Sequence, residues 1–122
     1  RDRVPSEDEM NLLMKEFGDN PFIGYWHDFG HIQRKHNLLI LNHEQFLRRM
    51  SSHLIGGHVN DVKWPARDHQ VPLLGGVVPF ERLLPFFPHG VPLVWELSSR
   101  VSSEDIRAAH KLWMEKFPQT LA

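Results

Sequence analysis

The chain has 122 residues, enough for one domain that buries roughly two thirds of its unfolded surface. Its 14 basic and 15 acidic side chains leave a formal charge of −1 without any charged block, which argues against nucleic acid as a partner. No apolar run approaches the about 20 residues of a membrane span, so no membrane partner is expected. The absence of cysteine excludes disulfides and thiolate metal sites and fits the cytoplasm, the location that we expect.

The first segment predicts a helix followed by a strand. Ser6 and Glu9 have the spacing of a capping box, and the helix that they begin has one apolar face, formed by Met10, Leu13, Met14 and Phe17. The sequence Gly-Asp-Asn-Pro at 18–21 ends this helix. Residues 22–26 are apolar without alternation, which predicts a strand that is covered on both faces.

The middle of the chain predicts one further helix and strand between two irregular segments. Residues 29–41 are expected to form a long loop or mixed segment, with Arg34, Lys35 and His36 as either an anion-binding patch or a solvated loop. Asn42 and Gln45 begin a helix that runs to Met50, and a strand follows at 54–59. Residues 60–79 contain several prolines and a Gly-Gly pair, so we expect no regular structure there.

The last third predicts two more helices around a third strand. A short helix is expected at 80–87, a strand at 92–97, and a final helix that Ser102 caps and Pro118 ends. Alternation of helices and strands favours a parallel sheet with right-handed crossovers. The whole chain, 1–122, is therefore predicted to be α/β, either a small open sheet or the C-terminal half of a (β/α)8 TIM barrel.

The position of the polar residues favours the barrel. Asp28, His58 and Glu96 each stand at or just beyond the C-terminal end of a predicted strand. Barrel enzymes collect their chemistry at these ends. A mixed carboxylate and imidazole set suits a divalent Mn, Mg, Co or Zn ion, which can act as a Lewis acid on a carbonyl or phosphoryl oxygen.

Each of these residues also has a simpler interpretation. Asp28 can cap a turn after the strand, and His58 can be a hydrogen-bonded, partly buried histidine. Glu96 follows an apolar strand, where an acid is costly to bury unless it is paired or metal-bound. Most other histidines are explained by solvation on helices or turns (His43, His53, His89 and His110), whereas alternation places His27 between the sheet and the helices.

Three motifs in order resemble the xylose-isomerase-like or endonuclease-IV-like TIM barrels, which include sugar isomerases and epimerases. Asp28-Phe-Gly-His31 looks like the Asp-x-x-His motif after strand 6 of that family, and His58-Val-Asn60-Asp61 looks like its His-x-Asn-Asp segment after strand 7. Glu96 looks like the acid that ends strand 8. The resemblance covers about residues 5 to 117 and makes the chain strands 6 to 8 of a partial barrel.

The resemblance also implies roles for individual residues. Asp28, His58 and Glu96 would bind the divalent metal together with a glutamate of strand 5, which would lie before Arg1. Glu96 would also be the catalytic base for proton transfer next to a carbonyl. His31 would be a second catalytic residue, which contacts the substrate in members with a single metal or a second metal in hydrolytic members. We expect the substrate to be a carbohydrate, and Asp61, His69 and Trp26 are further candidate substrate contacts.

Two alternatives to an isomerase or epimerase remain open, a phosphoesterase and a non-catalytic partial domain. Hydrolytic members of the family carry Asp-x-His in the seventh loop, whereas this chain has Arg67-Asp68-His69-Gln70, so one ligand of a multi-metal site is lost whichever alignment applies. This departure argues against a phosphoesterase. The remaining alternative is a non-catalytic partial domain, and in either case a half barrel leaves two unpaired sheet edges, from which we expect homo-oligomers.

Overall fold

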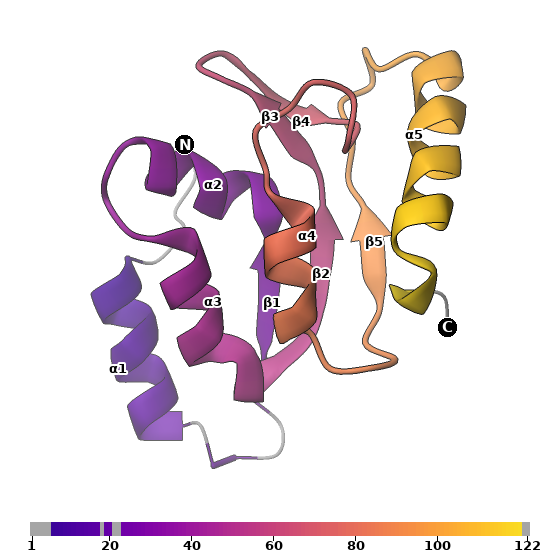
Figure 1. Ribbon diagram of the computed structural model, residues 1–122. Helices are drawn as coiled ribbons and strands as arrows, with labels where there is room; N and C mark the ends of the chain where they lie inside the picture. Colours follow the sequence, from indigo (N-terminus) through magenta and orange to yellow (C-terminus); the bar gives the residue numbers. More distant parts are fainter. Residues whose placement is uncertain (1–5, 18, 21–22, 121–122) are drawn as a thin grey trace.

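The structure of the protein is a computed structural model that describes residues 6–17, 19–20 and 23–120. Its main sheet contains β1 (Tyr25–Asp28), β2 (Leu54–Val59) and β5 (Leu93–Trp95), which are parallel and lie in the order in which they follow along the chain (Figure 1). The chain is therefore a mixed α/β protein with a small parallel sheet. The three strands were predicted, and the middle one has the predicted bounds.

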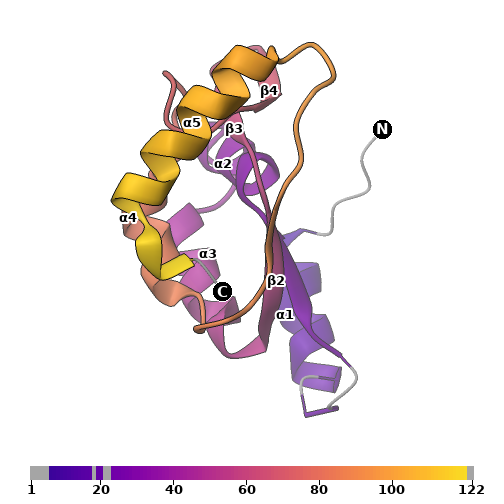
Figure 2. The ribbon, with the colours of Figure 1, turned by 90° about the vertical axis from the view of Figure 1, so that its right-hand side faces the viewer.

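Helices cover one face of this sheet. Helix α3 (His43–Met50), the short α4 (Phe80–Leu83) and α5 (Ser103–Lys116) lie on the same side of the strands (Figure 2). Their apolar side chains form the core with the covered face of the sheet, and its fully buried members include Phe29, Phe46, Leu47, Val59, Phe80 and Leu83. The other face is more open, because Trp26, Ile55 and Val94 are exposed there.

The N-terminal helix α1 (Glu7–Phe17) begins with the predicted capping box. The Ser6 N–H donates to Glu9 Oε1 (2.8 Å), and the Glu9 N–H donates to Ser6 Oγ (3.1 Å). Its apolar face meets the core only in part, since Met10 is buried while Leu13 and Phe17 are exposed. The predicted stop signal and the start of the first strand include Gly18, Pro21 and Phe22, which lie outside the described residues.

Of the two possibilities predicted for 29–41, a long loop is wrong, because most of the segment is a helix followed by a turn. Residues Phe29–Asn37 form helix α2, and the Asp28 side chain caps it by accepting the His31 N–H (2.9 Å). The helix ends in a Schellman motif, in which Leu39 has a φ of 62° and the N–H groups of Leu39 and Ile40 donate to the carbonyls of His36 and Lys35. The cap signal at Asp28 was present in the sequence, but Gly30 and the polar residues after it masked the helical pattern.

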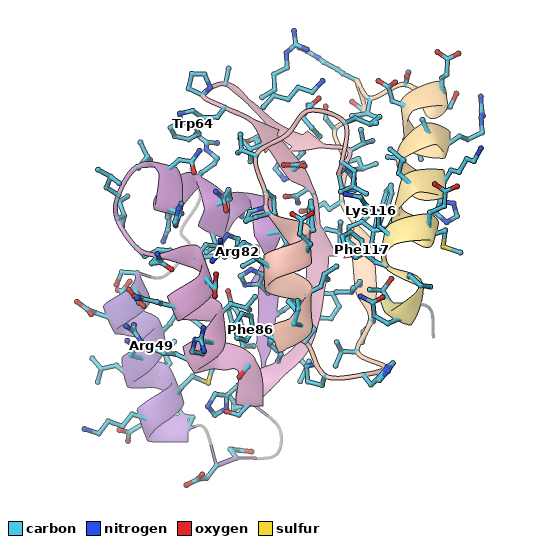
Figure 3. All side chains as sticks on the ribbon, in the orientation of Figure 1. Arg49, Trp64, Arg82, Phe86, Lys116 and Phe117 are labelled. Atoms are coloured by element: carbon cyan, nitrogen blue, oxygen red, sulfur yellow. The ribbon has the colours of Figure 1, made fainter. Side chains whose placement is uncertain are left out.

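The segment 60–79 also contains more regular structure than predicted. Strands β3 (Asp61–Lys63) and β4 (Arg67–Gln70) form an antiparallel hairpin, with Trp64 at its turn (Figure 3). The buried Asp61 carboxylate holds this segment together by accepting the N–H groups of Val62 (2.8 Å), Val78 (2.9 Å) and Leu73 (3.4 Å). A β-carbon at Gly76 would collide with that carboxylate, so the glycine allows the close approach.

The remaining helices follow the prediction closely. Asn42 caps α3 through the Gln45 N–H (2.9 Å), and Ser102 caps α5 through the Asp105 N–H (3.1 Å). The predicted helix at 80–87 is instead the short α4 followed by a 3-10 turn, η2 (Leu84–Phe86), because Pro85 cannot continue an α-helix. None of the helices in the described part of the chain is long and apolar enough for a membrane span.

A bulge in β2 sets which side chains face the open side of the sheet. Tyr25 pairs with Leu54, but the next residue, Trp26, pairs with Gly56, so Ile55 is an extra residue in β2. From there the pairing is regular and brings Asp28 opposite His58. The bulge therefore places His58 on the same face as Asp28, while its neighbour Val59 is fully buried.

A buried chain of hydrogen bonds connects β1 to α2 and α3. Gln33 Nε2 donates to Asn37 Oδ1 (2.9 Å), so Gln33 Oε1 is left to accept from His43 Nδ1–H (2.7 Å). His43 Nε2 then accepts from His27 Nε2–H (2.9 Å), and His27 Nδ1 accepts from the Tyr25 hydroxyl (3.0 Å). The bonds thus assign one neutral tautomer to each histidine.

Burial keeps both histidines of this chain neutral. Burial, followed by the neighbouring His43, holds the pKa of His27 well below its usual value. Burial and then His36 lower the pKa of His43 to about 3. The position predicted for His27, between the sheet and the helices, is confirmed, whereas the solvated position expected for His43 is wrong.

Candidate metal centre

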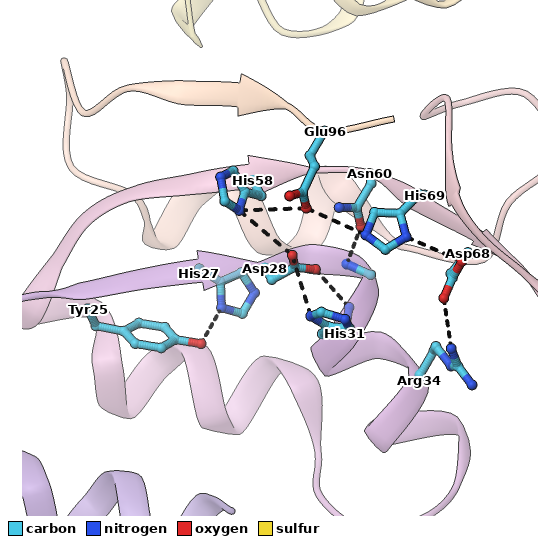
Figure 4. Close-up of polar contacts among 11 residues, drawn as sticks. Tyr25, His27, Asp28, His31, Arg34, His58, Asn60, Asp68, His69 and Glu96 are labelled. Atoms are coloured by element: carbon cyan, nitrogen blue, oxygen red, sulfur yellow. Dashed lines mark hydrogen bonds and ion pairs between the residues drawn. The ribbon is translucent and has the colours of Figure 1, made fainter. Parts of the chain in front are cut away.

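Three side chains from the C-terminal ends of the three parallel strands lie close together. Asp28 is the last residue of β1, His58 is the residue before the end of β2, and Glu96 follows β5 directly. One ligand atom from each lies within 4.8 Å of the other two (Figure 4). The structure therefore brings together the three residues that the sequence analysis proposed as metal ligands.

The distances in this cluster suit a divalent ion. His58 Nδ1 lies 3.9 Å from Asp28 Oδ2 and 3.7 Å from Glu96 Oε1. Two ligand atoms about 2.1 Å from a tetrahedral metal are themselves about 3.4 Å apart, so small rotations of these side chains would complete the geometry. One imidazole nitrogen and two carboxylate oxygens are also a donor set that suits zinc or manganese.

Asp28 has two roles in this arrangement. Its Oδ1 accepts the N–H of His31 and caps α2, while Oδ2 faces the cluster, 3.5 Å from His31 Nδ1. The simpler interpretation of Asp28 as a cap is therefore confirmed, and it leaves one oxygen for a ligand. The cap also fixes the carboxylate, because the backbone of α2 holds its first oxygen.

Glu96 occupies a more open position than expected. Its N–H donates to the Val59 carbonyl (3.0 Å), which continues the β2–β5 pairing and directs the side chain to the open face. The side chain is 46% exposed, so the expectation that burial makes this acid costly is wrong. The exposure leaves room for a substrate beside the carboxylate.

The hairpin supplies a second layer of polar side chains. His69 Nε2 lies 3.5 Å from Glu96 Oε1, and His69 Nδ1 lies 3.2 Å from Asp68 Oδ1. Arg34 from α2 binds the other oxygen of Asp68 (2.9 Å). Of the two residues, His69 therefore lies next to the cluster, whereas Asp68 is connected to it only through His69.

The backbone at His69 positions its side chain between Asp68 and Glu96. Its φ is 53°, in the left-handed region that side-chain-bearing residues rarely adopt. This conformation breaks the alternation of a strand, and the Ser98 N–H holds it by donating to the His69 carbonyl (2.8 Å). Such strain costs about 1–3 kcal/mol and is common at functional sites.

The charge of Asp68 is stabilised despite its partial burial. Burial alone would raise the pKa of Asp68, but the hydrogen bond and charge of His69 and the charge of Arg34 outweigh it, so the pKa is lowered. Asp68 therefore stays ionised and orients His69 toward Glu96. Arg34 was predicted as part of an anion patch or a solvated loop, and it instead pairs with this acid.

Three of the other predicted site residues lie beside the cluster. Trp26 lies on the open face, with its ring in edge contact with His58 (5.4 Å between ring centres), and it lines a cavity of about 180 Å³ together with Asp28 and His31. The ring of His31 meets that of His69 edge on (5.8 Å). Trp26, His31 and His69 are therefore next to the cluster.

Asp61 lies apart from this group of side chains. It is buried, its oxygens accept backbone N–H groups, and burial raises its pKa although those hydrogen bonds oppose the shift. These contacts give Asp61 a structural role. A substrate contact at Asp61 stays a prediction, and the structure shows no contact of Asp61 with the cluster.

One polar residue near the site was not proposed from the sequence. Asn60 is buried, its Oδ1 accepts the Gly30 N–H (2.9 Å), and its Nδ2 has no hydrogen-bond partner among the described residues. Its position directly after β2, at the end of a strand like the three proposed metal ligands, was the sequence signal that could have indicated it. The bond to Gly30 joins the end of β2 to the first turn of α2, and a β-carbon at Gly30 would displace it.

The fold and the site define the chain as an α/β protein with a candidate divalent-metal centre at the C-terminal ends of a parallel sheet. No protein-family profile matches the chain, and no curated protein matches it significantly.

Proposed function

We propose that the chain forms strands 6 to 8 of a (β/α)8 barrel and carries much of the active site of a metal-dependent sugar or sugar phosphate isomerase or epimerase. The convergence of Asp28, His58 and Glu96 at the ends of three successive parallel strands carries the proposal. Consecutive units of a barrel have this strand order, with their helices on one face of the sheet.

A divalent ion held by Asp28, His58 and Glu96 would supply Lewis acidity to a substrate carbonyl. Glu96 has the exposure needed to take a proton from the neighbouring carbon, and His69 Nε2 lies 3.5 Å from one of its oxygens. A positioned carboxylate of this kind contributes about 10²–10⁴-fold to the rate. His31 lies between Asp28 and His69, where it can donate to a substrate oxygen, and Trp26 provides an apolar wall for the sugar ring.

Metal binding by the chain tests the ligand set. Isothermal titration with Mn²⁺ or Zn²⁺ is expected to give one ion per chain, and Asp28→Asn and Glu96→Gln are each expected to weaken binding at least tenfold. His89→Gln is the matched control, because His89 is an exposed histidine outside the cluster. Equal affinity in all four proteins would refute the assignment.

Product analysis tests the chemistry. Proton transfer next to a carbonyl incorporates deuterium from D₂O into a sugar and changes its stereochemistry without releasing phosphate. A phosphoesterase is the second candidate, because His69 lies next to the cluster with Asp68 behind it, and these two residues could contribute to a further metal site. Phosphate release together with more than one bound ion would favour it, and an absence of both activities would favour a non-catalytic domain.

The proposed setting is a reducing cytoplasm, which the absence of cysteine in the sequence supports. Homo-oligomers are proposed because the outer edges of β1 and β5 have no strand partner among the described residues. Analytical ultracentrifugation tests this point.

A further inference from the structure

A polar cavity of about 380 Å³ lies beside the candidate metal centre. The hairpin strand β4 and the loop after β5 form it together, and its lining residues are Arg67, Asp68, Gln70, Ser98, Arg100 and Val101. The bond from the Ser98 N–H to the His69 carbonyl joins these two segments (2.8 Å). The same backbone contact thus shapes the cavity and holds His69 at the cluster.

The cavity carries excess positive charge. Asp68 is the only acid among the described lining residues, and it is already bound by Arg34 and by His69. Arg67 and Arg100 have no ion-pair partner among the described residues. Two unpaired guanidinium groups in one cavity are a typical arrangement for binding an anion.

A hydroxyl group completes the set of donors. Ser98 Oγ accepts the N–H of Arg100 (3.2 Å), so the Ser98 hydroxyl proton is free to donate into the cavity. Two planar guanidinium groups and one hydroxyl match the several oxygens of a phosphate monoester better than the two oxygens of a carboxylate.

We propose that this cavity, between Arg67, Ser98 and Arg100, binds the phosphate group of a phosphorylated sugar. The inference rests on the proposed function, because the carbonyl end of the same sugar would lie at the metal centre. The imidazole of His69 spans the distance between the two sites, with Asp68 on one side and Glu96 on the other. This arrangement makes a sugar phosphate, and not a neutral sugar, the substrate of the enzyme.

Phosphate binding is measured first without metal, on protein treated with a chelator and then dialysed. Titration with inorganic phosphate, followed by NMR, is expected to shift the signals of the segments 67–70 and 98–101. Arg67→Gln and Arg100→Gln are each expected to weaken phosphate binding about tenfold or more, since each removes charge-assisted hydrogen bonds. Arg107→Gln, at an exposed arginine of α5, is the matched control and should bind phosphate as the wild type does.

Four outcomes would overturn the inference. These are no binding of phosphate at millimolar concentrations, equal binding in the wild type and both cavity variants, loss of binding in the control as well, and binding of glucuronate as tight as that of phosphate. Arg67→Lys keeps the charge and should retain part of the affinity, which separates a charge effect from misfolding.

Metal titration of the same proteins distinguishes this inference from the proposed function. If the cavity variants lose phosphate but bind metal normally, the phosphate site is supported independently. If the wild type binds phosphate at the cavity but binds no metal, the proposed function fails while the phosphate site stands.

Discussion

Acid should destabilise this protein through its two buried histidines. In the unfolded chain each histidine gains a proton near pH 6.5, whereas in the folded protein burial lowers both pKa values, that of His43 to about 3. Below pH 6.5 the unfolded state therefore binds more protons, and the free energy of unfolding falls as the pH falls. From pH 7 to pH 5 the loss is about 2 kcal/mol for each histidine, or about 4 kcal/mol for both, a large part of a typical stability.

The variant His43→Gln isolates one of these two contributions. Its side chain can still accept the His27 N–H, but it does not titrate, so the loss between pH 7 and pH 5 should fall to about 2 kcal/mol. Urea unfolding followed by circular dichroism at several pH values measures this difference. His89→Gln removes an exposed histidine and should keep the dependence of the wild type. If His43→Gln and the wild type lose the same stability over this range, the neutral, buried state of His43 is refuted.

Three further predictions concern single positions. Leu39→Gly should raise the free energy of unfolding by about 1 kcal/mol, because Leu39 has a φ of 62° that glycine adopts without strain. The leucine side chain is 92% exposed, so its loss removes little packing, and a lower melting temperature of the variant would contradict this prediction. Ser102→Ala should lower the free energy of unfolding by about 1 kcal/mol, because it removes the cap of α5. Urea unfolding measures this loss with Ser103→Ala as the control, and equal losses in both variants would contradict a specific cap. Glu96→Gln should abolish deuterium incorporation by the intact enzyme and change the free energy of unfolding by less than about 0.5 kcal/mol; normal turnover would remove Glu96 from the mechanism.

Local signals made much of the fold predictable. The caps at Asn42 and Ser102 mark helix starts because each side chain satisfies a backbone N–H within three residues, a relation that is present in the sequence itself. The clustering of Asp28, His58 and Glu96 was also predictable, since the C-terminal ends of parallel strands meet at one edge.

Features that depend on distant contacts were not predictable from the sequence. In the sequence, His43 looks like a solvated residue at the start of a helix. In the structure it is buried, because β1 places His27 in hydrogen-bond contact with it. Periodicity does not indicate the left-handed backbone of His69, which depends on a hydrogen bond from Ser98. The approach of Arg67 to Arg100 follows from the same contact, so the cavity between them becomes visible only in three dimensions.

The extra residue in β2 makes the effect of a change in strand length depend on where in the strand it falls. A strand has two faces, so every position along it is either odd or even, and Ile55 reverses that parity between Leu54 and His58. Removing Ile55 would make Leu54 and Gly56 consecutive opposite Tyr25 and Trp26, so His58 would stay opposite Asp28 and Val59 would stay in the core. Removing Gly57 instead would turn His58 into the core and Val59 onto the open face. Single insertions and deletions between Gly56 and His58 should therefore be selected against far more strongly than the loss of Ile55 or changes in the surrounding loops. The metal centre thus depends on how many residues separate the bulge from His58 as well as on which residues they are.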